Sequence, residues 1–220
     1  LGRANAFKID LMGMLGHEIG NPLTSVMGHA QVGAESLAAG DAEQARRSLE
    51  VVERNAIQIR LVLHDILTLV SSESGELVAR PEDVVVGHHV RAAVSALPPE
   101  RQPAIVCPDS LTARVQPSHL DQMLANLLGN AEKYAGGATS VEVAESGDGH
   151  DGRIDISVID GGPGVAGALR ENLFQRFSRG SETSGDVSGT GLGLFITRQL
   201  AHANSGRLSH RDASPTGSVF

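Results

Sequence analysis

The stretch Asn126-Leu-Leu-Gly-Asn-Ala-Glu-Lys-Tyr134 guides the interpretation of the whole chain. It lies inside a segment whose apolar spacing predicts a helix. Asn126, Asn130 and Lys133 are separated by four and three residues, so their side chains lie close to one helical face, and Tyr134 follows directly. This face brings together an amide oxygen suited to a hard cation, an ammonium group suited to phosphate and an aromatic ring suited to a base.

Two glycine-rich stretches follow this helix along the chain. Asp160-Gly-Gly-Pro-Gly164 comes directly after a strand-like run that ends at Ile159, so a carboxylate stands beside glycines that let a ligand approach the backbone. A buried aspartate there can accept a hydrogen bond from an adenine amino group. Gly189-Thr-Gly-Leu-Gly193 leads into a predicted helix, whose free N-terminal amides favour a phosphate. Neither a P-loop nor a Rossmann fingerprint occurs in the chain.

The elements around these motifs predict an α/β region. Helices are predicted at about residues 87–97, 117–135 and 191–204. Strand-like runs occur at residues 84–86, 104–106, 140–143 and 154–159. Because no helix separates the last two runs, we expect a sheet that is at least partly antiparallel, with helices on one face. Residues 178–190 are rich in Gly and Ser, which predicts a mobile loop.

The first part of the chain predicts two long packed helices. Apolar residues repeat there at alternating steps of three and four. The two stripes are Met12, Leu15, Ile19, Pro22 and Val26, widened by Leu11, Leu23 and Met27, and then Leu49, Val52, Ala56, Ile59, Leu63, Ile66 and Val70. Ala39-Gly-Asp41 supplies a glycine and an N-cap aspartate, so the helices should reverse into an antiparallel hairpin. Such a hairpin cannot bury its broad apolar face alone, which predicts a dimeric four-helix bundle.

The predicted fold class is therefore α+β: a helical hairpin that forms a dimeric four-helix bundle, followed by an α/β sandwich. Ser71-Ser-Glu-Ser-Gly-Glu76 breaks the helical period and Pro81 follows, which predicts a linker. We expect a dimerisation domain over residues 1–72, a linker over 73–81 and a second domain over 82–220.

Composition narrows the function classes. The 220 residues carry a formal net charge of −8, which argues against nucleic acid or an anionic membrane as the main partner. No apolar stretch approaches 18 residues, so we expect no spanning helix and no direct membrane contact from this segment. A single cysteine, Cys107, favours a reducing compartment, and we expect the cytoplasm. The strand-like run at Phe220 suggests a piece of a longer protein.

In their order along the chain, the motifs resemble those of sensor histidine kinases. Residues 126–134 resemble the N box, 160–164 the first glycine box, 173–177 the F box and 189–193 the second glycine box. The resemblance implies an ATP-binding sandwich of the gyrase, Hsp90, histidine kinase and MutL superfamily, with residues 165–188 as an ATP lid. The residues it places at the ATP site are Asn126, Asn130, Lys133, Tyr134, Asp160, Gly162, Gly164, Phe174, Arg176, Phe177, Gly189, Thr190, Gly191, Leu192 and Gly193.

The resemblance also implies individual roles at this site. Asn130 would bind Mg²⁺, Lys133 would lie near phosphate, Asp160 would contact adenine and Tyr134 would line the base pocket. Gyrase-like ATPases need a carboxylate base about one turn before the metal-binding Asn, where this chain has Asn126. Activation of water is therefore disfavoured, and another phosphoryl acceptor is expected.

The run Leu15-Gly-His-Glu-Ile-Gly-Asn-Pro-Leu23 resembles the phospho-acceptor H box of the same family. His17 is two residues from both Leu15 and Ile19, so it should point away from these core positions, toward solvent. Glu18 can accept the Nδ1 proton and so orient the ring for attack through Nε2. Asn21 carries no useful basicity, and in this family its position resembles one that orients a water for phosphatase action.

The sequence thus predicts a protein-histidine kinase that uses ATP and Mg²⁺. The γ-phosphoryl group would pass to His17 and then to an aspartate of a response regulator, with possible phosphatase action. A non-catalytic scaffold that binds nucleotide as a switch and a gyrase-like ATPase remain alternatives. The other eight histidines lack partners at metal-ligand spacing, so no metal beyond Mg²⁺ is expected.

Overall fold

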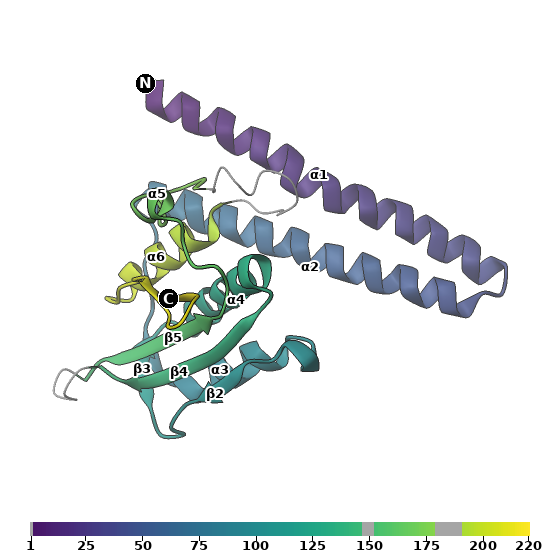
Figure 1. The fold of residues 1–220 in the computed structure, drawn as a ribbon. Helices are drawn as coiled ribbons and strands as arrows, with labels where there is room; N and C mark the ends of the chain where they lie inside the picture. Colours follow the sequence, from purple (N-terminus) through teal and green to yellow (C-terminus); the bar gives the residue numbers. More distant parts are fainter. Residues whose placement is uncertain (1, 147–151, 179–190) are drawn as a thin grey trace. The chain divides into compact units, whose positions relative to one another are not determined.

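The computed structural model describes residues 2–146, 152–178 and 191–220, apart from the side chains of residues 2–11, 14, 15, 17 and 168 (Figure 1). The predicted loop at 178–190 therefore lies, except for Ser178, outside the described residues. The chain divides into two compact units, Leu1–Val70 and Ser71–Phe220. Each unit is described by itself.

The first unit is the predicted antiparallel hairpin, formed by α1 (Gly2–Ala38) and α2 (Ala42–Glu73), whose last turn extends into the second unit. The reversal uses the two residues that the sequence singled out. Gly40 adopts a φ of +80°, which glycine tolerates without strain. The Oδ1 atom of Asp41 accepts a hydrogen bond of 2.9 Å from the backbone N–H of Gln44, which is the geometry of a helix N-cap.

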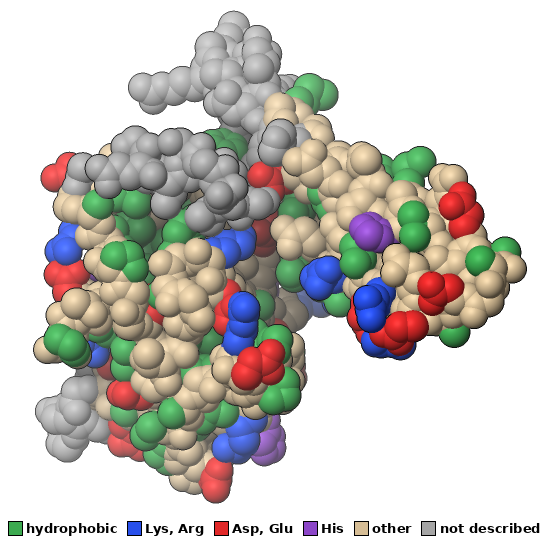
Figure 2. Space-filling view, turned by 45° about the vertical axis from the view of Figure 1, so that its right-hand side comes forward, with side chains coloured by type: hydrophobic (Ala, Val, Ile, Leu, Met, Phe, Trp, Pro, Cys, Tyr) green, Lys and Arg blue, Asp and Glu red, His purple; other side chains and the backbone are tan. Residues whose placement is uncertain are grey.

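The two helices bury only part of their apolar surface within one chain. A Cβ added to Gly33 would lie 3.4 Å from the Cβ of Ser48, so the helices approach closely at this glycine. By contrast, Met12 and Met27 keep 74% and 67% of their surface exposed. Leu23, Leu49, Leu63 and Val70 from the predicted stripes are also exposed, and Figure 2 shows hydrophobic side chains on the surface of the hairpin. The hairpin alone therefore leaves an apolar face uncovered.

The second unit contains a five-stranded sheet in the order β2-β4-β5-β7-β6 and a separate pair β1-β3. Among the described strands, β2 and β4 pair in parallel and the other pairs are antiparallel, in agreement with the expected sheet that is at least partly antiparallel. The strands are β1 (Glu82–Val85), β2 (Ala104–Val106), β3 (Thr112–Val115), β4 (Ala138–Glu145), β5 (Ile154–Asp160), β6 (Arg211–Asp212) and β7 (Ser218–Val219).

Helices pack on one face of this sheet and form the core with it (Figure 1). The α/β unit contains the helices α3 (Val86–Ser95), the short 3₁₀ helix Pro99–Arg101, α4 (Pro117–Ala135), α5 (Gly167–Arg170) and α6 (Gly193–Ala203). Of these, α3 and α4 contact the sheet, and α6 packs against α4. In β4, Val141 and Val143 are buried while Glu142 and Ala144 are exposed, so only one face of the strand is covered. The helix α4 contacts both β4 and α6, which makes it the central helix of the unit.

Two elements differ in detail from the expectation. Val86 was predicted as part of a strand, but it begins α3 and its N–H donates to the carbonyl of Leu111. The helix α2 extends to Glu73. It is terminated by Gly75, which has a φ of +72°. There the N–H groups of Glu76 and Leu77 both donate to the carbonyl of Ser71, which satisfies an end carbonyl of the helix.

Candidate functional site

The helix α4 presents the predicted polar face. Leu127, Leu128 and Ala131 are buried in the core, whereas Lys133 and Tyr134 are exposed. Asn126 and Asn130 are half-buried, on the same side of the helix as each other by their spacing of four residues. The helix ends at Gly136, which has a φ of +74°.

Asn126 connects α4 to the start of α6. Its Nδ2 donates a hydrogen bond of 3.3 Å to the carbonyl of Gly193, and the hydroxyl of Thr197 donates to the same carbonyl at 2.8 Å. Because the amide nitrogen faces Gly193, Oδ1 is the atom of Asn126 that can serve a cation. The contact also places the N-terminal amides of α6 beside the polar face of α4, and such amides favour an anion.

Asp160 is held rigidly at the end of β5. It is 8% exposed, and its Oδ1 accepts hydrogen bonds from the N–H of Gly162 at 2.9 Å and of Ser218 at 3.1 Å. These bonds to an ionised acceptor fix the orientation of the carboxylate. They leave Oδ2 to accept a further donor, which is the role that the sequence predicts for this residue toward adenine.

Close backbone contacts around Asp160 explain why glycine occupies several positions near it. A Cβ at Gly162 would lie 2.6 Å from the Cβ of Ala135, at the end of α4. Gly164 has a φ of +75°, and a Cβ there would meet the carbonyl of Gly217 at 3.3 Å. A Cβ at Gly217 would lie only 1.9 Å from the carbonyl oxygen of Asp160. The loop after β5 therefore packs directly against α4 and against the start of β7.

The described part of the second glycine box begins at Gly191. This residue has a φ of +66°, and a Cβ on it would lie 3.1 Å from backbone atoms of Phe177. Leu192 is fully buried and anchors the start of α6. Gly189 and Thr190 lie outside the described residues, and so do residues 179–188 of the predicted lid.

The F-box residues lie against α6. The guanidinium of Arg176 is 5.6 Å from the ring centre of Phe195, and that of Arg198 is 5.9 Å from the ring centre of Phe174. The same side chains line a surface groove formed by Phe174, Gln175, Arg176, Phe195, Arg198, Gln199 and His202. Phe177 has a φ of +58° and contacts Gly191 through its backbone. Residues of the predicted F box thus pack against α6.

The predicted acceptor residues lie on α1. His17 is within the helix, but its side chain lies outside the described atoms. Glu18 is 7% exposed, whereas Asn21 is exposed and Pro22 is buried. The Glu18 carboxylate and the Asn21 amide, three residues apart, therefore differ in their access to solvent.

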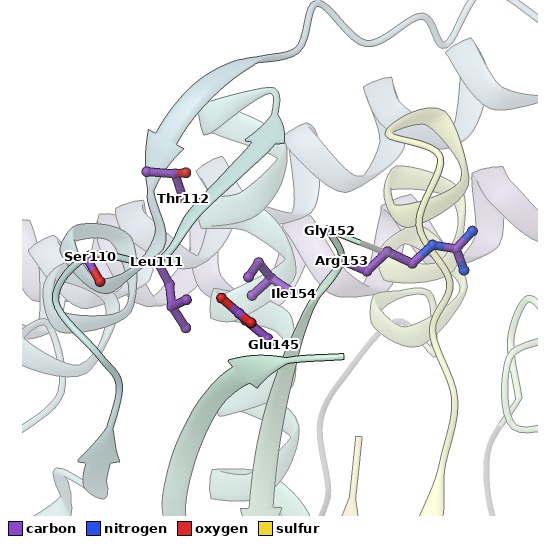
Figure 3. Close-up of a pocket in the computed structure, with 7 residues that line it drawn as sticks. All are labelled: Ser110, Leu111, Thr112, Glu145, Gly152, Arg153 and Ile154. Atoms are coloured by element: carbon purple, nitrogen blue, oxygen red, sulfur yellow. The ribbon is translucent and has the colours of Figure 1, made fainter. Parts of the chain in front are cut away.

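A separate cavity of about 230 Å³ lies at the far end of the β4–β5 hairpin. Figure 3 shows Glu145 between Leu111 and Ile154, while Arg153 extends away from them. The cavity is lined by Ser110, Leu111, Thr112, Glu145, Gly152, Arg153 and Ile154, none of which belongs to the predicted ATP site.

Three residues that support the site were not predicted. Ser218 binds Asp160 through its backbone N–H, Thr197 binds the carbonyl of Gly193, and Gly217 makes room for the Asp160 backbone. Only Gly217 gave a signal, as a glycine directly before a strand-like run. The other two act through contacts that no local pattern encodes.

Comparison with known proteins assigns both units. Residues 7–75 match the His Kinase A (phospho-acceptor) domain, and residues 115–220 match the histidine kinase-, DNA gyrase B- and HSP90-like ATPase domain. The virulence sensor protein BvgS of Bordetella bronchiseptica is 30% identical over 98% of this chain, and the signal transduction histidine-protein kinase AfsQ2 of Streptomyces coelicolor is 29% identical over 94%. The chain spans 18% and 39% of these two relatives.

A solved structure supports the fold. The histidine kinase AdeS of Acinetobacter baumannii superposes with a TM-score of 0.57 at 20% identity, over 92% of this chain and 94% of that one. Because it carries both the phospho-acceptor domain and the ATPase domain, the chain belongs to the family of sensor histidine kinases of two-component systems. In the part of the chain that the structure describes, no helix combines the length and apolar character needed to cross a membrane.

Proposed function

We propose that the chain transfers the γ-phosphoryl group of ATP to His17 and from there to an aspartate of a response regulator. The observation that carries this proposal is the contact of Asn126 with Gly193, which joins the polar face of α4 to the N-terminus of α6. The ATPase-domain match supports the use of ATP. The phospho-acceptor match over residues 7–75 supports an acceptor on α1.

The site residues divide the recognition of ATP. Asp160 accepts a hydrogen bond from the adenine amino group through the oxygen that Gly162 and Ser218 leave available. The N-terminal amides of α6 and the ammonium group of Lys133 bind phosphate oxygens. Gly162 and Gly191 keep the backbone close to neighbouring elements, where side chains would clash.

The donor set of α4 suits Mg²⁺, which prefers oxygen ligands. Asn130 is the proposed ligand, and Asn126 uses Nδ2, not Oδ1, in its bond to Gly193. When bound, Mg²⁺ neutralises charge that develops on the phosphate oxygens. The protein contributes by positioning the reacting groups, because phosphoryl transfer requires little other chemistry from side chains.

The acceptor step uses His17 and Glu18. Nε2 of His17 forms a bond to the γ-phosphorus while the bond from that phosphorus to the bridging oxygen breaks, and ADP leaves. Glu18 takes the Nδ1 proton, which makes the neutral imidazole a better nucleophile as its charge develops. Asn21 orients a water for attack on the aspartyl phosphate of the regulator, which is the proposed phosphatase reaction.

The proposal includes a homodimer, because the exposed apolar stripe on the hairpin needs a second copy to cover it. It also places this segment in the cytoplasm, where ATP and the regulator are found. The division of labour is that residues 1–72 dimerise and accept phosphate, residues 73–81 connect, and residues 82–220 bind ATP.

The test is incubation of the chain with γ-labelled ATP and Mg²⁺. Label on the protein that is lost in acid and retained in base supports phosphohistidine. Released inorganic phosphate without labelled protein would indicate a gyrase-like ATPase, and binding without either product would indicate a nucleotide-binding scaffold. Asn130→Asp is the matched control: it should lose the label and weaken Mg²⁺–ATP binding measured by calorimetry, with unchanged helix content.

A further inference from the structure

Gln116 lies beside the first strand pair of the α/β unit, where the connector between the two proposed domains ends; at the start of the connector, Glu73 pairs with Arg176 at 2.9 Å. The strands β1 and β3 pair with Glu82 opposite Val115, so the next positions outward are Pro81 opposite Gln116 and Arg80 opposite Pro117. Neither proline has a backbone N–H to continue the ladder. The pairing of backbones therefore stops at Glu82.

The side chain of Gln116 supplies the bond that the prolines cannot. Its Oε1 accepts a hydrogen bond of 2.9 Å from the backbone N–H of Arg80, and its Nε2 donates to the hydroxyl of Ser118 at 2.9 Å. The connector is thus held at Arg80, two residues before its first strand pair at Glu82.

Gln116 is itself held on the rigid part of the unit. Its backbone N–H donates at 2.8 Å to Oδ1 of Asn204, the residue that follows the last turn of α6. Since that oxygen faces Gln116, Nδ2 of Asn204 faces the ring of buried His119 at 2.9 Å and the carbonyl of Leu200 at 2.8 Å. The start of α4 and the end of α6 therefore fix the residue that holds the connector.

At its other end the connector is held by α2. Leu77 donates its N–H to the carbonyl of Ser71, so only Val78 and Ala79 lie between the two held positions. Val78 is 74% exposed. Without the Gln116 side chain, the free segment would extend from Val78 to Pro81 and so double from two residues to four.

We propose that Gln116 is a positioning residue for phosphoryl transfer, because its side-chain carbonyl keeps the free part of the connector short. This inference rests on the proposed kinase function. Once a tether is longer than the span it must cross, the effective concentration of bound ATP at the acceptor helix falls roughly as the −3/2 power of tether length. Doubling the free segment should lower the rate of transfer about threefold.

The test uses the whole chain in single-turnover labelling with γ-labelled ATP. Gln116→Ala should lower the rate at saturating ATP about threefold and leave the apparent KM for ATP unchanged. Gln116→Glu keeps an acceptor oxygen for Arg80 and should restore the rate. Insertion of two glycines between Val78 and Ala79 in the otherwise unchanged chain should reproduce the loss.

Backbone amide exchange at Arg80, followed by NMR, gives a readout that does not depend on activity. Exchange should be faster in Gln116→Ala and restored in Gln116→Glu. Unchanged exchange and labelling rate in Gln116→Ala would overturn the proposal, as would a rise in KM that accounts for the whole loss. A wild-type chain that takes no label would instead contradict the proposed kinase function. In that case, unchanged Arg80 exchange in Gln116→Ala would still show that the Gln116 side chain does not hold the connector.

Discussion

The helical hairpin and the α/β unit differ in how far they bury their apolar side chains. In the α/β unit, Val90, Val141, Ile196 and Leu200 are fully buried within a single chain. In the hairpin, apolar residues of the predicted stripes remain exposed along both helices. The α/β unit has a hydrophobic core of its own, whereas the hairpin leaves apolar side chains exposed.

From this difference we expect nucleotide binding to depend on one chain and stability of the hairpin to depend on two. The proposed ATP site is built from α4, α6 and the end of β5, all in one unit, and the contacts of Asn126 and Asp160 that support it lie within the chain. The acceptor lies on a helix that we propose to be stable only as part of a dimer. Perturbations of the two regions should therefore separate nucleotide binding from assembly.

The largest expected effect is in the α/β unit. Gly217→Ala should destabilise this unit by about 3 kcal/mol or more, because its φ is +115° and the new Cβ would overlap the carbonyl oxygen of Asp160. Nucleotide binding should be lost, while the hairpin still forms dimers. Urea unfolding followed by circular dichroism, with calorimetry of ATP binding, measures both. Gly167→Ala, which has no atom within 4 Å of the new Cβ, should stay within about 0.5 kcal/mol of wild type.

The converse perturbation is in the hairpin. Leu23→Glu places a charge in the exposed stripe of α1 and should weaken the dimer about 100-fold, since two copies of the side chain lose their burial. Val32→Glu is the matched control, because nine residues further along the helix is a rotation of about 180°. Sedimentation equilibrium should show dissociation of the first variant alone. Equal weakening by both changes would place the dimer face elsewhere.

Within the hairpin, neighbouring residues should have separate tasks. Glu18→Gln should lower the rate of autophosphorylation about 100-fold, because the amide cannot take the imidazole proton. Asn21→Ala should keep autophosphorylation and lose phosphatase activity toward a pre-phosphorylated regulator. Both reactions are measured on each variant. Loss of both activities in Asn21→Ala would indicate a structural role instead.

The smallest effect concerns pH and the α/β unit. Burial lowers the pKa of His210 below its ordinary value of 6.5, an effect partly opposed by the carboxylate of Asp212. The unfolded chain then binds a proton more readily, so stability present above about pH 6.5 is lost as the pH falls toward the folded pKa. The urea midpoint should fall less between pH 7.5 and 5.5 in His210→Leu than in wild type. Replacement of exposed His88 by Leu should leave the wild-type fall unchanged.

Much of this architecture could be predicted from local patterns. The spacing of apolar residues at steps of three and four predicted the two long helices, and Gly40 with Asp41 predicted their reversal. Both signals could be read because they depend on residues close together in the sequence. The alternation in β4 and β5 gave the antiparallel pair. Helix spacing gave the shared face of Asn126 and Asn130.

The features that escaped prediction depend on distant partners. The strand β3 is only four residues long, and β6 is two residues, too short for a periodic signal. Gln116 meets Asn204 across 88 positions and Arg80 across 36, so nothing nearby marks its role. The contact of Gly217 with Asp160 likewise exists only in the folded sheet.

We propose that the γ-phosphoryl group of ATP bound in the α/β unit is transferred to His17 in the hairpin. The most direct measurement compares acid-labile labelling and ATP affinity in His17→Gln and wild type. We expect His17→Gln to bind Mg²⁺–ATP with wild-type affinity and to take up no acid-labile label. If label persists in His17→Gln, the phosphoryl acceptor lies elsewhere in the chain.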